Sequence, residues 1–193
     1  MISGTWGYLV RMLPGAVLAA LLYLALIPLR KRRLVQAELF SPRHREFILF
    51  LFFLFCGGMA LITLTPRWFH WLELLSGAQT EAFFQLGTVN WIPFRTFSTD
   101  SWSLLILLGN VIMFLPIGFF PVLLWRNVSW ARVLFIGLST TLFIEIVQLF
   151  VGRTFDIDDI LLNTLGVVLG GSLCALLRRL APTLATAFQV QHT

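Results

Sequence analysis

The side chains best suited to chemistry lie in the segment 141–170, where two apolar helical runs flank a short acidic hinge. Glu145 and Gln148 are three residues apart, so they share one face of the first run. A second stripe, at offsets of three and seven residues, consists of Asp156, Asp159 and Asn163. An acid inside a bilayer must be paired, protonated or solvated, and such acids usually mark functional sites. We therefore interpret Glu145 as the leading candidate functional residue.

A structural interpretation of the acidic hinge competes with the functional one. Asp156 fits the cap of the second helix and Asp159 its third position, where free amides and the helix dipole favour carboxylates. Glu145, Asp156 and Asp159 also offer the oxygen ligands that calcium or magnesium prefers. No known loop spacing supports a cation site, and we predict neither a metal nor another cofactor. If the protein is an enzyme, these three acids are the candidates for catalytic acid and base.

Polar residues in apolar or aromatic surroundings are the candidates for ligand binding. Amides within apolar runs suit either hydrogen bonds between helices or contact with a ligand. Arginines beside aromatic or acidic residues suit an anionic group, or a surface ion pair with the hinge. The candidate binding residues are Asn90, Arg95, Asn110, Gln148, Arg153 and Asn163.

The composition places these residues in a membrane protein. Of the 193 residues, 58% are hydrophobic and 12% are charged, and the mean hydropathy is +0.87. A soluble domain of this size cannot hide so much apolar side chain. The net charge of +5 does not indicate nucleic acid, because the charges fall between the apolar runs and sort by side. Cys56 and Cys174 lie in separate apolar runs, so we expect buried small residues without disulfide or metal.

Each of five apolar runs is close to the ~20 residues that cross a bilayer. The runs predict an all-α polytopic integral membrane protein that forms a single domain over residues 1–193. The long loop after the second run begins with tryptophans at helical spacing, which predicts a helix lying in the membrane interface. We expect a weakly ordered cytoplasmic tail over residues 180–193. The five runs cover residues 12–29, 46–64, 103–124, 131–151 and 159–177.

The basic residues predict how the spans are oriented. Ten of the 14 lysines and arginines fall on one side of the five spans, which is typical of the cytoplasmic side. The N-terminus then lies outside and the C-terminus inside, and the acidic hinge faces out. Glu145, Asn110 and Asn163 come to similar depths below the outer surface. We therefore predict a polar pocket open to the outside, in which Glu145 and Asn163 are neighbours.

The spacing of the polar motifs resembles that of the VanZ-like family, over residues 46–177. This resemblance implies a protein of the bacterial cytoplasmic membrane that is associated with resistance to the lipoglycopeptide teicoplanin. It does not supply a reaction. The motifs are Asn90-x-x-Pro93-Phe94, Asn110-x-x-x-Phe114-x-Pro116-x-Gly118, Glu145-x-x-Gln148 and Arg153-x-x-Asp156-x-x-Asp159-x-x-x-Asn163-x-x-Gly166-x-x-x-Gly170.

Two functions are consistent with the predicted pocket and the resemblance. In the first, a non-catalytic protein binds a lipid, a lipid-linked cell-wall precursor or a lipoglycopeptide antibiotic. In the second, an intramembrane transferase or hydrolase modifies a lipid-linked envelope substrate, with Glu145, Asp156 and Asp159 as acid and base. The sequence contains no recognisable nucleophile motif, which favours the first. In both cases the expected partners are membrane lipids or lipid-linked envelope molecules, and not nucleic acid.

Overall fold

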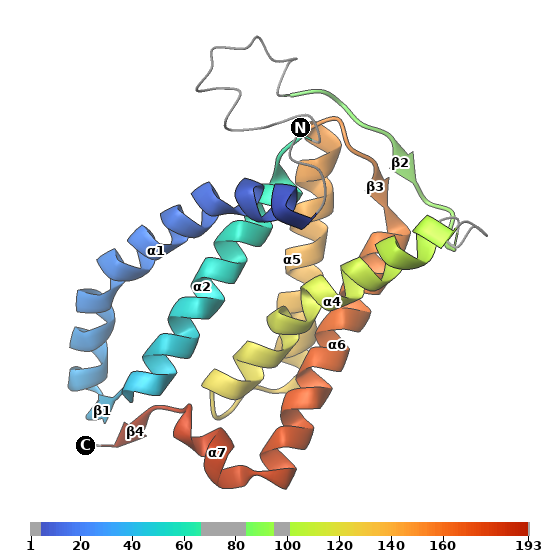
Figure 1. Cartoon of the computed structure of the whole chain (residues 1–193). Coiled ribbons are helices and arrows are strands. Elements are labelled where there is room, and N and C mark those ends of the chain that lie inside the picture. The colour runs from blue at the N-terminus through green and yellow to red at the C-terminus, as the bar shows by residue number, and fades with distance from the viewer. Residues whose placement is uncertain (1–4, 67–83, 95–100, 193) are drawn as a thin grey trace.

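A computed structural model of the chain describes residues 5–66, 84–94 and 101–192, and Figure 1 shows its architecture. Five of the described helices are long and apolar enough to cross a membrane. The predicted class, an all-α polytopic membrane protein, is thereby confirmed. The predicted interfacial helix and Arg95 fall outside the described residues. The five helices are α1 (Thr5–Gln36), α2 (Arg43–Leu64), α4 (Ser101–Leu124), α5 (Trp130–Phe150) and α6 (Ile157–Leu180).

Short elements close the two ends of the helix bundle. At one end, β1 (Leu39–Phe40) pairs antiparallel with β4 (Gln191–His192). At the other end, β2 (Val89–Asn90) pairs parallel with β3 (Phe155–Asp156). The tail expected to be weakly ordered contains α7 (Pro182–Ala187) as well as β4.

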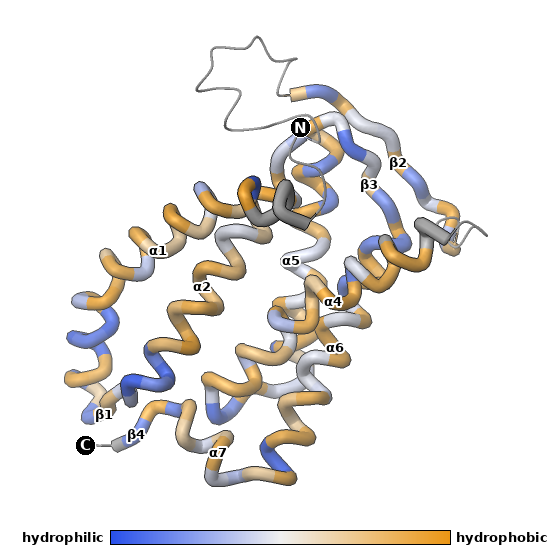
Figure 2. Tube along the Cα trace, viewed as in Figure 1, coloured by the Kyte–Doolittle hydropathy of each residue, from blue (hydrophilic) through white to orange (hydrophobic). Residues whose placement is uncertain are grey.

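The first helix is longer than its apolar run. It continues through the basic residues 30–33 to Gln36, whereas the apolar run ends at Leu29. Arginine and lysine are good helix formers, so the change of composition ends the apolar surface without ending the helix. Figure 2 shows the resulting hydrophilic segment at one end of α1, next to the hydrophilic start of α2.

The helices form a pair and a three-helix group. In Figure 1, α1 lies along α2, while α4, α5 and α6 pack together on the other side of α2. The central apolar cluster joins the two parts, because Met59 of α2 packs with Phe114 of α4, Ile144 of α5 and Val167 of α6. Phe114 and Val167 are fully buried, so this cluster is the core of the membrane domain.

Helices α4 and α6 approach each other closely, and glycines make this approach possible. A Cβ atom at Gly118 of α4 would clash with the backbone carbonyl of Val167. A Cβ at Gly166 or Gly170 of α6 would likewise clash with backbone carbonyls of α4. Small residues allow membrane helices to approach this closely, and the resulting van der Waals contact stabilises their association.

We therefore expect Gly118→Ala to destabilise the protein, by about 1–3 kcal/mol as for other overpacked cores. The matched control is Gly109→Ala in the same helix, since a Cβ there has no neighbouring atom within 4 Å. Thermal unfolding in detergent measures both variants. Equal stability of the two would show that α4 and α6 do not depend on this close approach.

Candidate functional site

Acidic side chains close the hinge between α5 and α6. Glu145 is 1% exposed, and its Oε2 accepts a hydrogen bond from the backbone amide of Asp156 at 2.9 Å. The side chain of Asp156 in turn accepts from the backbone amide of Asp158 at 2.9 Å, so Asp156 caps α6. This is the capping arrangement that the structural interpretation of the hinge predicts. It gives free amides at a helix N-terminus the acceptors they need.

The segment 84–94 lies along this hinge. Through the pairing of β2 with β3, Asn90 comes next to Asp156, and its Nδ2 donates to Asp156 Oδ1 at 3.0 Å. The backbone amide of Phe94 donates to Asp158 Oδ1 at 2.6 Å. Two parts of the chain that are more than 60 residues apart are thus joined by carboxylate hydrogen bonds.

Asp158 is not among the candidate residues of the sequence. It falls outside the stripe of Asp156, Asp159 and Asn163. In the structure Asp158 is 1% exposed and holds the turn at Phe94. The signal available in the sequence is its place in the first turn of α6, where carboxylates are favoured.

The candidate amides bond to neighbouring helices. Asn110 of α4 donates to Asp159 Oδ1 of α6, and Gln148 of α5 donates to the carbonyl of Thr63 in α2 at 3.1 Å. Together these two amides tie α4 to α6 and α5 to α2.

Asn163 of α6 bonds to a side chain of α5. Its Nδ2 donates to Thr141 Oγ1 at 2.9 Å, whereas the carboxylate of Glu145 is directed to the hinge. A carboxylate bonds most strongly to a free amide at a helix start, which leaves the hydroxyl of Thr141 for Asn163. The Oδ1 of Asn163 is buried and has no hydrogen-bond partner among the described residues.

Arg153 ties the hinge to α2. Its Nη1 donates to the carbonyls of Ile62 and Thr63, at 3.3 and 3.2 Å. These carbonyls belong to the C-terminal turn of α2, which lacks intrahelical donors and carries the negative end of the helix dipole. The described residues contain no group of three or more histidines, cysteines and acids arranged to hold a metal.

A large groove lies beside this polar cluster. Its volume is about 850 Å³, and its walls are mostly apolar side chains of α2, α4 and α5, including Phe52, Met59, Ile117 and Ile136. None of the predicted site residues lines the groove. The polar cluster therefore adjoins the groove but does not form its walls. We define this cluster as Asn90, Asn110, Glu145, Gln148, Arg153, Asp156, Asp158 and Asp159.

The membrane-spanning helices and the polar cluster at one of their ends define a polytopic membrane protein with a buried hydrogen-bonded hinge. The chain belongs to the VanZ/LLP1 family, whose family model matches residues 15–178. The match begins within α1 and ends within α6, so it includes most of the first helix, beyond the residues on which the sequence resemblance was based. No curated protein and no solved structure matches the chain.

We expect Glu145→Ala to lower the free energy of unfolding by about 1–3 kcal/mol, because it removes the acceptor of a buried amide. Glu145→Gln is the matched control, since an amide oxygen can also accept from the Asp156 amide. Unfolding of both variants in detergent provides the comparison. If glutamine is as destabilising as alanine, the hinge requires the carboxylate itself and not simply an acceptor.

Proposed function

We propose that this protein is a non-catalytic binder of lipid-linked or lipidated molecules, and that the groove between α2, α4 and α5 holds their lipid chain. The observation that carries the proposal is the groove itself. Its volume of about 850 Å³ is typical of ligand sites, which are roughly 300–1,000 Å³ in size. Within a membrane domain, an apolar groove of this kind suits a hydrocarbon chain.

The two ends of the groove differ in chemistry. At one end, its lining residues Leu64 and Ile144 directly precede Thr65 and Glu145, close to the polar cluster. At the other end it is lined by Arg126 and Arg132. An amphipathic molecule can therefore lay its chain along the groove while its polar part stays at an end.

The orientation that we propose is the one indicated by the basic residues, with the N-terminus outside and the polar cluster in the outer half of the bacterial cytoplasmic membrane. Lipid-linked cell-wall precursors and lipoglycopeptide antibiotics meet at that surface. Binding either of them would reduce the access of a drug such as teicoplanin to its target. This links the groove to the resistance that the family resemblance implies.

The enzyme alternative assigns Glu145, Asp156 and Asp159 to acid and base catalysis. The hydrogen bonds of these acids support a non-catalytic binding protein instead. Each acid accepts a hydrogen bond from a backbone or side-chain amide, and these bonds position a helix or a loop. Mass spectrometry of membrane lipids, with and without the protein, separates the two functions. A new or missing lipid species would support the enzyme and contradict the binder.

Filling the groove should block binding. We expect Ile136→Trp to abolish or strongly weaken the binding of teicoplanin to the purified protein, because the larger ring occupies the space for the acyl chain. Leu138→Trp is the matched control. Leu138 is 41% exposed and Ile136 38% exposed, but only Ile136 lines the groove.

The probe also has a matched form, teicoplanin without its acyl chain. Both forms are titrated against the wild-type protein and the two variants in neutral detergent. The proposal requires that only the acylated form binds and that only Ile136→Trp affects it. Equal binding of both forms would place recognition in the glycopeptide and contradict a chain-binding groove.

A further inference from the structure

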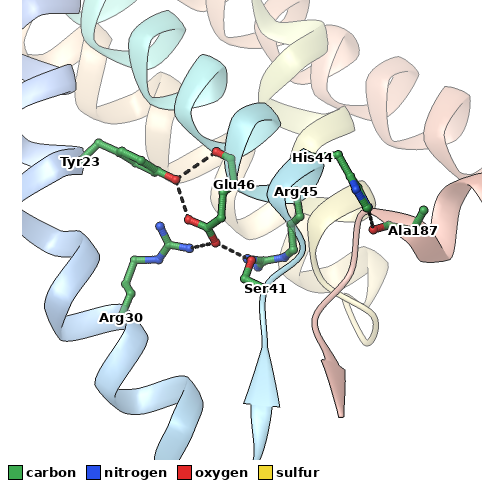
Figure 3. A network of polar contacts seen from close by, with 7 residues as sticks. All are labelled: Tyr23, Arg30, Ser41, His44, Arg45, Glu46 and Ala187. Atoms are coloured by element: carbon green, nitrogen blue, oxygen red, sulfur yellow. Dashed lines mark hydrogen bonds and ion pairs between the residues drawn. The ribbon is translucent and has the colours of Figure 1, made fainter. Parts of the chain in front are cut away.

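A second polar cluster lies at the opposite end of the helices, between α1 and α2. Figure 3 shows Tyr23 and Arg30 of α1 converging on Glu46 of α2. The Tyr23 hydroxyl donates to Glu46 Oε2 and the Arg30 Nη2 donates to Glu46 Oε1, both at 2.7 Å. The Arg30 guanidinium also lies over the Tyr23 ring, 5.4 Å from its centre. These contacts hold Arg30 in one position.

Arg45 adds a second cation to this cluster. It is 5% exposed, its Nη1 donates to Ser41 Oγ at 3.0 Å, and the same nitrogen lies 3.5 Å from Glu46 Oε1. Both oxygens of Glu46 are therefore already engaged by donors. Glu46 pairs with Arg30 and Arg45, and Lys31 follows Arg30 in the chain, so these four side chains together carry a net charge of +2.

Two nitrogens of this cluster still have hydrogens to donate. Arg30 Nη1 and Arg45 Nε are buried, and neither has a hydrogen-bond partner among the described residues. Leaving a charged donor unpaired away from water is costly, so an acceptor is expected to reach it. The observation indicates a ligand with anionic oxygens.

A cavity of about 220 Å³ lies beside this cluster, and of the two arginines only Arg30 lines it. Its polar lining residues are Arg30, Lys31, Ser41 and Glu46. The remaining lining is apolar and comes from the last turns of α1 and from the β1 region. The cavity lies where the membrane-spanning segments Val10–Gln36 and Arg43–Leu64 end and begin, which is the depth of lipid headgroups.

We propose that this cavity binds the phosphate of an anionic phospholipid. Arg30 and Lys31 donate to the phosphate oxygens, and the apolar lining contacts the glycerol and the first methylenes of the chains. The surplus positive charge favours a lipid with net negative charge over a zwitterionic one, as in other basic pockets at the ends of membrane helices. The site shares no lining residue with the groove of the proposed function, and it does not depend on that function.

The test compares phosphatidylglycerol with phosphatidylcholine of identical acyl chains, added to the full chain in neutral detergent. Bound lipid is counted by native mass spectrometry. We expect the wild-type protein to prefer phosphatidylglycerol. Lys31→Gln should weaken this binding by about tenfold, the effect of losing one hydrogen bond to a charged group.

Arg32→Gln is the matched control. Arg32 belongs to the same basic run and is exposed, but it does not line the cavity. Both variants lose one positive charge, so only a specific site distinguishes them. Arg30 is left unchanged in the test because it forms an ion pair with Glu46, whereas neither Lys31 nor Arg32 does in the described part of the chain.

Three results would overturn the proposal. An equal loss in the two variants would show diffuse attraction to the basic run. Equal binding of phosphatidylglycerol and phosphatidylcholine would show that the surplus positive charge does not select anionic lipids. Displacement of the lipid by inorganic phosphate alone would show a site for free anions and not for a lipid headgroup.

Discussion

The carboxylate of Glu145 accepts a hydrogen bond from the backbone amide of Asp156, and this bond closes the turn between α5 and α6. A backbone amide without a partner is costly at membrane depth, so irregular backbone persists there only where the protein supplies acceptors. The neighbouring acids also accept hydrogen bonds from amides. Asp158 accepts from the backbone amide of Phe94, and Asp159 accepts from the side-chain amide of Asn110 in α4. These carboxylates thereby join α4, α5 and α6 to one another and to the segment 84–94.

The groove is a consequence of where these bonds lie. Gln148 and Arg153 attach α5 and the hinge to the last turn of α2. Farther along α2, side chains of α2 and α5 line the groove, while glycines bring α4 and α6 into close contact. Figure 1 shows α2 between its partner α1 and the three-helix group. The attachment at one end and the apolar space beyond it together support the binding of a long hydrocarbon chain.

Much of this fold was predictable from the sequence, because an apolar run of ~20 residues has few alternatives to a membrane span. The sequence also placed Asn110 at a depth similar to that of Asn163, and in the structure Asn110 bonds to Asp159, on the same helix as Asn163. The partner of Asn163 and the role of Asp158 were not predictable, since they depend on which surfaces of distant segments meet. Arg30 belongs to the basic run that the sequence offers only as a topology signal, because its partner Glu46 is separated from it by a turn that the sequence does not position.

The central claim is that the groove holds a lipid chain, and the two cysteines of the protein allow a direct measurement. Cys56 lines the groove, whereas Cys174 is fully buried. The protein in neutral detergent is treated with N-ethylmaleimide, and modification of each cysteine is followed by mass spectrometry with and without teicoplanin. We predict that Cys56 reacts, that bound teicoplanin slows its reaction in proportion to occupancy, and that the deacylated form does not. An unchanged rate at Cys56 when teicoplanin is bound would contradict the account.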